Sequence, residues 1–164
     1  MNIEIERRFI VRSEEWKKFI NSSQEFKQGY LVSKKDSWTI RIRIIDEKEA
    51  LITLKYPKER ISRYEFEYEV PIEDGYSIWN LAEFKISKTR YQLRLNDHTW
   101  IVDSFKEQNS PLVLAEIELN TIEEKIDIPQ WCSSEISDAK EFSNASLAKS
   151  PISSWPIEKR RSIL

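Results

Sequence analysis

The sequence predicts a mainly β protein of the α+β class: a closed eight-stranded antiparallel β-barrel, forming a tunnel, with helices packed outside and a C-terminal helical tail. Three observations support this prediction. Charged and apolar residues alternate with the period of a β-strand along roughly eight segments. The charges of each segment therefore share one face, and acids and bases nearly balance on these faces. A sheet of this size can close around a lumen wide enough for one small ligand.

The clearest starting point is the segment at residues 3–10. Glu4, Glu6 and Arg8 share one strand face, and Phe9 lies on the opposite, apolar face. The other predicted strands divide in the same way. They cover residues 26–32, 37–45, 51–55, 63–70, 88–95, 99–105 and 115–119.

Turns and helices are predicted between these strands. Residues 13–20 have a Ser N-cap and an apolar stripe, which predicts a short amphipathic helix, and a turn with a second helix is expected between residues 71 and 84. Pro57 is predicted to end its strand, and Asn96-Asp97 favours a tight hairpin turn. Five tryptophans are expected to cover the outside of the barrel: Trp16, Trp79, Trp100, Trp131 and Trp155.

A length of 164 residues suits one domain, with the barrel over about residues 2–120 and the tail over about 121–164. The net charge of −2 gives no support for nucleic acid or an anionic membrane as partner. Only 2 glycines argue against glycine-rich phosphate loops, so phosphate binding must use side chains. No signal peptide or membrane-spanning segment is recognisable, and with the single Cys132 this predicts a cytoplasmic protein.

The strand faces that carry charge define the candidate site. Solvated ion pairs on an open sheet are the alternative interpretation, but such a face usually mixes in uncharged polar residues. Crowded carboxylates repel one another unless hard cations such as Mg²⁺ or Mn²⁺ lie between them, and clustered Arg and Lys suit phosphoryl oxygens. A metal-bound polyphosphate satisfies both groups, which predicts phosphoryl transfer. The acids are Glu4, Glu6, Glu65, Glu67, Asp103, Glu116 and Glu118, and the bases are Arg8, Arg41, Arg43, Lys55, Arg63, Lys88 and Arg90.

These residues resemble those of the CYTH, or triphosphate tunnel metalloenzyme, superfamily, which includes bacterial tripolyphosphatases, thiamine triphosphatases and class IV adenylate cyclases. The match covers about residues 2–120. Residues 4–9 are similar to the Glu-x-Glu-x-Lys signature of the family. Further motifs follow in the order of the family: Arg41-Ile42-Arg43, Thr53-Leu54-Lys55, Arg63 to Glu67, Lys88-Thr89-Arg90-Tyr91, Val102-Asp103 and Glu116-Ile117-Glu118.

The resemblance implies roles for these residues. It implies that two Mg²⁺ or Mn²⁺ ions are held by Glu4, Glu6, Asp103, Glu116 and Glu118. It implies that a triphosphate is gripped by Arg8, Arg41, Arg43, Lys55, Arg63, Lys88 and Arg90, with Tyr30 and Lys140 as further contacts. Glu65 and Glu67 would orient water or the basic residues, and they join Glu4, Glu6 and Arg8 as the catalytic set.

Two positions depart from the family pattern. Arg8 stands where the signature has Lys, and Ile101 stands where some members have a second acid. The first functional hypothesis is metal-dependent hydrolysis of a triphosphate, with inorganic tripolyphosphate giving pyrophosphate and phosphate. The alternatives are a class IV adenylate cyclase, which makes cyclic AMP and pyrophosphate from ATP, and a non-catalytic polyphosphate- or nucleotide-binding module. A small-molecule triphosphate is the expected partner, and a homodimer is left open.

Overall fold

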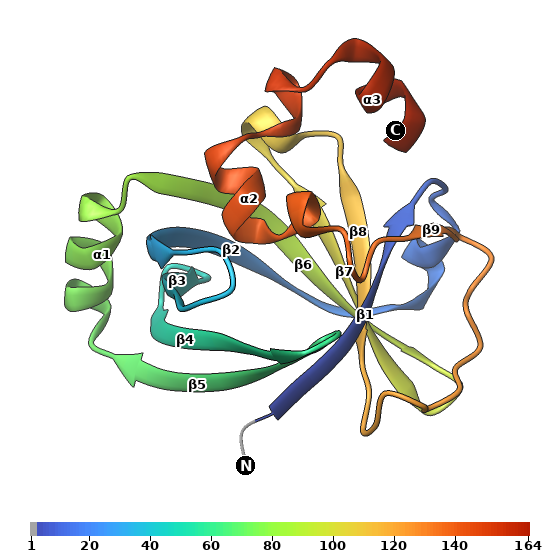
Figure 1. Ribbon diagram of the computed structural model, residues 1–164, viewed down its shortest axis with the longest axis horizontal. Helices are drawn as coiled ribbons and strands as arrows, with labels where there is room; N and C mark the ends of the chain where they lie inside the picture. The colour runs from blue at the N-terminus through green and yellow to red at the C-terminus, as the bar shows by residue number, and fades with distance from the viewer. Residues whose placement is uncertain (1–2) are drawn as a thin grey trace.

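The computed structural model describes residues 3–164 and shows strands that curve into a barrel (Figure 1). The strands are β1 (Ile3–Val11), β2 (Ile20–Ser33), β3 (Thr39–Ile45), β4 (Glu49–Glu59), β5 (Ser62–Val70), β6 (Phe84–Leu95), β7 (His98–Phe105), β8 (Val113–Glu118) and β9 (Cys132–Glu135). Their order is β5-β4-β3-β2-β6-β7-β8-β1-β9, and β1 also pairs with β5. That last pairing closes an eight-stranded antiparallel barrel, so the predicted fold class is confirmed.

Strand β1 forms both sides of the closure. Near its start Glu4 lies opposite Arg63 of β5, and further along Arg8 lies opposite Glu116 of β8. Because side chains alternate along each strand, these four charged residues all point to the same face of the sheet, the inner one. The closure therefore brings charged side chains of β1, β5 and β8 into one lumen.

Two local predictions about the strands had different outcomes. Asn96 and Asp97 form the predicted hairpin turn between β6 and β7, both with positive φ angles, 48° and 63°. The prediction that Pro57 ends its strand is wrong, since β4 continues through it to Glu59. Pro57 lies opposite Arg63 directly before a register shift, an irregular place in the ladder where a missing N–H is tolerated.

The helix predicted at residues 13–20 is only a 3-10 helix, η1 (Glu15–Phe19). Trp16 is its one buried residue, whereas Phe19 is exposed and Ile20 already belongs to β2, where it pairs with Leu93. Strand pairing of the β-branched Ile20 therefore takes precedence over the helical pattern.

Helix α1 (Ile72–Leu81) confirms the second predicted helix and packs against the outer face of β3 and β4. Gly75 makes this close approach possible. A Cβ atom added there would lie 2.3 Å from the Cβ of Ala50, which is far inside van der Waals contact. Helix and sheet thus meet at a distance that only glycine allows.

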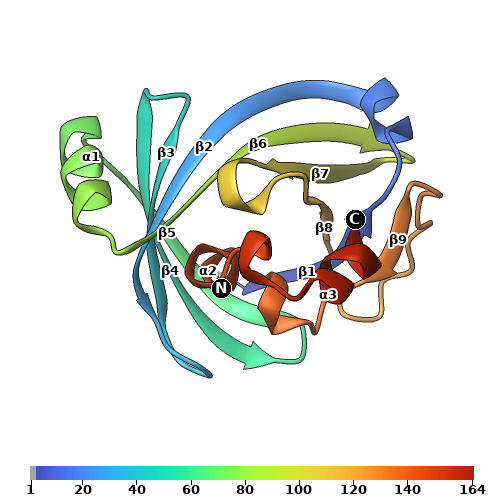
Figure 2. The same cartoon turned by 90° about the horizontal axis from the view of Figure 1, so that it is seen from above.

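The chain after β8 differs in part from the predicted helical tail. It contains strand β9, which pairs with β1 and was not predicted, followed by η3 (Lys140–Phe142), α2 (Asn144–Lys149), η4 (Ile152–Ser154) and α3 (Ile157–Ile163). Another 3-10 helix, η2 (Glu107–Asn109), lies between β7 and β8. Figure 2 shows the C-terminal helices at one end of the barrel, where α2 packs against β6 and β2. No helix within residues 3–164 is long and apolar enough to span a membrane.

The apolar residues form two cores. The outer core packs Phe9, Leu93, Trp100 and Ile117 beneath the rings of Trp16 and Trp131, which agrees with apolar faces on the outside of the barrel. The outer core also includes Val102, Ala115 and Leu119.

The end core lies on the inner face instead, at one end of the barrel. Ile10, Ile86, Phe105 and Leu114 alternate with Arg8, Lys88, Asp103 and Glu116, so they share the inner face with those charges. The C-terminal segment, defined here as residues 136–163, packs onto them through Phe142, Leu147, Ile152 and Trp155. Trp155 was expected on the outside; that expectation is wrong, because it packs edge-on against Phe142 in this core. The lumen is consequently closed by apolar packing at this end.

Candidate active site

The inner face of the barrel brings together most of the residues predicted for the site. Strand pairing sets acid opposite base at several positions: Lys55 with Glu65, Arg90 with Asp103, and Arg8 with Glu116. Lys88 is completely buried and Asp103 is 2% exposed, whereas Glu67 and Glu118 are exposed. The buried charges have to be paired, and the structure shows how.

Acids and bases from β1, β4 and β5 form the first group of the lumen. Glu4 accepts hydrogen bonds from Lys55 at 2.9 Å and from Arg63 at 2.7 Å, and Arg63 also pairs with Glu6. Lys55 reaches Glu65 at 2.7 Å. Two cations therefore hold three carboxylates in this part of the lumen.

The electrostatic balance of this group favours negative charge. Burial alone would raise the pKa of Glu6, but the positive charge of Arg63 lowers it below its ordinary value. The carboxylates of Glu6 and Glu4 in turn raise the pKa of Arg63, against the effect of its burial. Glu118 lies directly opposite Glu6, and burial together with the charges of Glu4, Glu65 and Glu6 raises its pKa. The group thus carries more carboxylates than its own cations neutralise.

Cations from β3 and β6 form the second group, around the ring of Phe26. Arg43 and Arg90 lie 4.6 and 5.0 Å from the ring centroid, and the ammonium of Lys88 lies 5.9 Å away. Arg90 holds Asp103 with two hydrogen bonds of 2.8 Å and reaches Glu116 at 2.7 Å. Arg90 therefore connects the cations of the second group to the carboxylates of Asp103 on β7 and Glu116 on β8.

Like charges in a buried space perturb the second group. Burial, with repulsion from Arg41 and Arg90, lowers the pKa of Arg43 to about 9. Burial lowers the pKa of Lys88 as well, although Asp103 opposes this shift. The charges of Arg90 and Lys88 hold the pKa of Asp103 well below its usual range despite its burial. Additional anionic oxygens would relieve this concentration of positive charge.

Neutral polar residues that the sequence analysis did not assign to the site hold the arginines. Gln28, fully buried, accepts from Nε of Arg43 at 3.0 Å and donates to the hydroxyl of Tyr30 at 3.0 Å. Thr53, also fully buried, accepts from Nε of Arg41 at 3.3 Å and donates to Glu67 at 2.7 Å. Counting the period of two along β2 and β4 would have found Gln28 and Thr53, since both lie on the inner face.

The C-terminal segment contributes polar contacts to the same lumen. The guanidinium of Arg8 donates to the carbonyl of Phe142 at 3.0 Å and lies 3.8 Å from Glu116. The ammonium of Lys88 donates to Oδ1 of Asn144 at 3.0 Å. Neither residue of the segment was predicted for the site, because a backbone carbonyl and a lone Asn carry no sequence signal.

Lys140 does not join the cluster. Its ammonium pairs with Asp36 at 2.8 Å, and its side chain is 73% exposed. Lys140 begins η3, so it belongs to the segment that closes the barrel, but its side chain faces solvent. The predicted contact between Lys140 and the substrate therefore stays a prediction.

The carboxylates of the lumen have the donor atoms that a hard divalent cation needs, but their side chains point at Lys and Arg partners and not at a common centre. Among residues 3–164, no group of three or more His, Cys, Asp or Glu side chains is arranged to hold a metal ion. Glu4 and Glu6 point at Lys55 and Arg63, and Asp103 points at Lys88 and Arg90. Their donors are all carboxylate oxygens, the ligands that Mg²⁺ and Mn²⁺ prefer. Burial, and after it the neighbouring carboxylates of Glu4, Glu65 and Glu6, raises the pKa of Glu118 beside them. A cation entering here would replace Lys or Arg partners.

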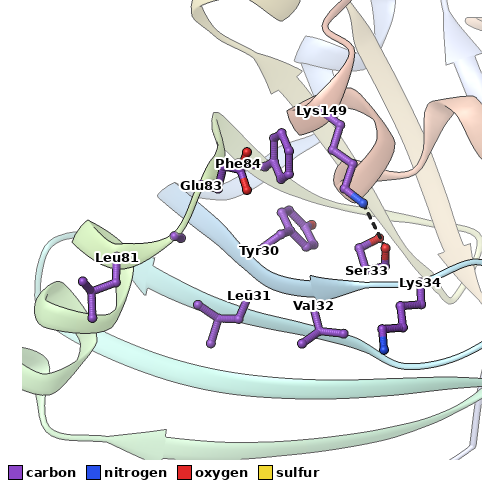
Figure 3. Close-up of a pocket in the computed structure, with 10 residues that line it drawn as sticks. Tyr30, Leu31, Val32, Ser33, Lys34, Leu81, Glu83, Phe84 and Lys149 are labelled. Atoms are coloured by element: carbon purple, nitrogen blue, oxygen red, sulfur yellow. Dashed lines mark hydrogen bonds between the residues drawn. The ribbon is translucent and has the colours of Figure 1, made fainter.

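A separate pocket of about 450 Å³ lies where β2, the end of α1 and the start of β6 meet α2 (Figure 3). It is lined by Tyr30, Leu31, Val32, Ser33, Lys34, Leu81, Ala82, Glu83, Phe84 and Lys149. Tyr30 is the one member of the predicted site in this lining. Lys149 donates to the carbonyl of Ser33 at 2.9 Å across the pocket. The pocket therefore differs in chemistry from the charged lumen.

A closed antiparallel barrel with clustered cations and carboxylates on its inner face defines a tunnel protein suited to a highly charged anion. The chain belongs to the CYTH domain family, whose model matches residues 2–149.

Curated relatives and solved structures agree with this family. The chain is similar to an inorganic triphosphatase of Acetivibrio thermocellus, 34% identical over 153 residues, covering 92% of this chain and 96% of the relative. An inorganic triphosphatase of Nitrosomonas europaea is 30% identical over 154 residues, covering 90% and 97%. A crystal structure of an inorganic triphosphatase has a TM-score of 0.63 at 29% identity, covering 88% of this chain and 93% of the other. A putative adenylyl cyclase from Hippeastrum, TM-score 0.58 at 14% identity, covers 72% of this chain and 80% of its own and shares the fold.

Proposed function

We propose that this chain is a metal-dependent triphosphatase that hydrolyses inorganic tripolyphosphate to pyrophosphate and phosphate within the lumen of the barrel. The observation that carries the proposal is the junction at Arg90, which joins a buried group of cations to a group of carboxylates in one enclosed space. The relatives named inorganic triphosphatase, which match over nearly the whole chain, support the same activity.

The cations have a defined part in this reaction. Arg41, Arg43, Lys88 and Arg90 bind the phosphoryl oxygens, and their charge stabilises the transferring phosphoryl group and the departing pyrophosphate. Their polar partners already fix them, with Gln28 holding Arg43 as one example, so little reorganisation is needed when substrate binds. The low exposure of the lumen strengthens each of these interactions.

The carboxylates take the second part. Glu4, Glu6, Glu116 and Glu118 would hold the metal, which supplies charge neutralisation and a more acidic water when bound. Glu65 and Glu67 orient Lys55 and Arg41, as their contacts indicate. Asp103 orients Lys88 and Arg90 in this structure, and its predicted metal contact remains part of the proposal. The choice of Mg²⁺ or Mn²⁺ and the count of two ions also belong to the proposal and are supported by the family resemblance. A cytoplasmic location is part of the proposal too and is supported by the single cysteine.

The test is phosphate release from tripolyphosphate, ATP and thiamine triphosphate with Mg²⁺ or Mn²⁺, with cyclic AMP assayed in the ATP samples. The double variant Glu4→Gln and Glu6→Gln removes two inner carboxylates, while Glu73→Gln makes the same change on α1, outside the barrel. We expect metal-dependent release from tripolyphosphate that is lost in the double variant and kept in Glu73→Gln, with thermal denaturation confirming that both fold.

Other outcomes would replace the proposal. Cyclic AMP and pyrophosphate from ATP would identify a cyclase. Tight binding of tripolyphosphate without turnover of any substrate would identify a binding module.

A further inference from the structure

Lys88 has two oxygen partners that come from distant parts of the chain. It lies on β6 and is fully buried, with Asp103 of β7 accepting one hydrogen bond and Oδ1 of Asn144 in α2 accepting another at 3.0 Å. An ammonium group carries three donors, so these two bonds leave one N–H for a ligand. The rings of Phe26 and Phe105, 5.9 and 5.5 Å from Nζ, flank the group. The orientation of the remaining N–H is therefore fixed by Asp103 and Asn144 together.

Asn144 is held in place by contacts independent of Lys88. Ser143 caps α2 by accepting a hydrogen bond from the backbone N–H of Ser146 at 3.1 Å. The buried Asn109 donates to the carbonyl of Leu147 at 3.1 Å, which ties α2 to η2. Leu147 itself is fully buried in the end core. The amide of Asn144 is thus delivered to Lys88 from a firmly packed support.

We propose that Asn144 is a positioning residue of the active site, acting through Lys88, so that the C-terminal segment completes the phosphate-binding group as well as closing the barrel. This inference depends on the proposed function for its substrate. Arg8 supports it independently, because its guanidinium donates to the carbonyl of Phe142 in the same segment. Two inner cations, from β1 and β6, are therefore set in position by one segment.

The first test compares Asn144→Ala with the neighbouring Ser143→Ala. Asn144→Ala removes the acceptor from Lys88, whereas Ser143→Ala removes the cap of α2 and leaves that acceptor in place. We expect the KM for tripolyphosphate to rise about tenfold in Asn144→Ala, the scale of a lost hydrogen bond to a charged group. Ser143→Ala should keep its KM within about twofold, since Asn109 still holds α2 through the carbonyl of Leu147 and Ser143 makes no contact to a charged inner side chain. Equal KM values in the wild type and Asn144→Ala, with both folded, would overturn the proposal.

A double-mutant cycle separates positioning from general support. In Lys88→Met the ammonium is absent, so adding Asn144→Ala should raise the KM by less than about twofold if Asn144 acts through Lys88. A full tenfold effect in that background would show that Asn144 acts otherwise and would overturn the inference. Asn144→Ser replaces Asn144→Ala in the cycle if the alanine variant does not fold.

The inference is separable from the proposed function. If the wild type turns over no triphosphate, the proposed function fails. The wild type, Asn144→Ala, Lys88→Met and the double variant are then compared by thermal denaturation. Coupling between the Asn144 and Lys88 changes in Tm would support the contact. Strict additivity of the two Tm shifts would refute it.

Discussion

Replacing Gln28 by Leu should weaken triphosphate binding through Arg43 without touching any charged residue. Gln28 is fully buried, lies directly opposite Arg43 in the β2–β3 pair, and accepts from its Nε at 3.0 Å. Leu is close to Gln in volume but leaves this N–H and the hydroxyl of Tyr30 without their partner. A hydrogen bond to a charged group contributes about 1.5–3 kcal/mol, so the KM for tripolyphosphate should rise by roughly one to two orders of magnitude.

The same change should lower stability by a measurable amount. About 1–3 kcal/mol is the usual cost of a buried group without its partner, and each kcal/mol corresponds to about 2–4 °C in Tm for a chain of this size. The assays are steady-state phosphate release and thermal denaturation of the metal-free protein.

Gln28→Glu is the matched control because it keeps an acceptor for Arg43. We expect it to preserve Tm and still raise the KM, since the added carboxylate competes with the phosphate for the guanidinium. An unchanged KM in folded Gln28→Leu would refute the assignment of Arg43 to the phosphate site or of Gln28 as the residue that orients it.

Three further predictions concern other parts of the molecule. Gly75→Ala should lower Tm although alanine favours helix, because its Cβ would lie 2.3 Å from that of Ala50; a higher Tm in denaturation curves would refute this close packing. Glu118→Gln should raise the Tm of the protein in chelator by relieving carboxylate repulsion, and should weaken metal-dependent phosphate release; a lower Tm would contradict the repulsion. His98 should titrate in NMR above its ordinary pKa of about 6.5 because Glu124 stabilises the protonated ring, so its favourable pairing is lost as pH rises through the shifted value. Glu124→Gln should bring the midpoint down, and an unchanged midpoint would exclude that pairing.

The sequence was informative wherever one strand face was charged. Period-two alternation predicted the inner face of β1, β3, β5 and β6 because burial of the opposite face fixes the register of each strand. It could not predict the end core, since Ile10 and Ile86 continue the inner faces of charged strands as apolar residues. Their burial depends on the C-terminal segment, which is distant in sequence. Local pattern carries no information on such a contact.

Site residues outside the charged pattern were missed for a related reason. The period of β2 places Gln28 on the inner face, but only the fold shows that it lies against the guanidinium of Arg43. Asn144 lies outside the strands and resembles any surface amide in the sequence, so only the fold shows that it faces the ammonium of Lys88. Lys140 was assigned through the family resemblance, and in this structure its side chain, on the three-residue η3, pairs with Asp36. Charge type predicts what a lumen could use. It does not predict which way a side chain on a short turn will point.

The departure of Arg8 from the family signature has a structural counterpart in the C-terminal segment. A guanidinium has five donors in a planar fork, so Arg8 can donate to the carbonyl of Phe142 and still lie within 3.8 Å of Glu116. A lysine at this position would have a compact ammonium on a shorter reach and could not span both partners in the same way. Arg8 thus links β1 and β8 to the segment that closes the barrel. Arg8 and the C-terminal segment therefore depend on each other, because a change in either would alter where the guanidinium of β1 lies in the lumen.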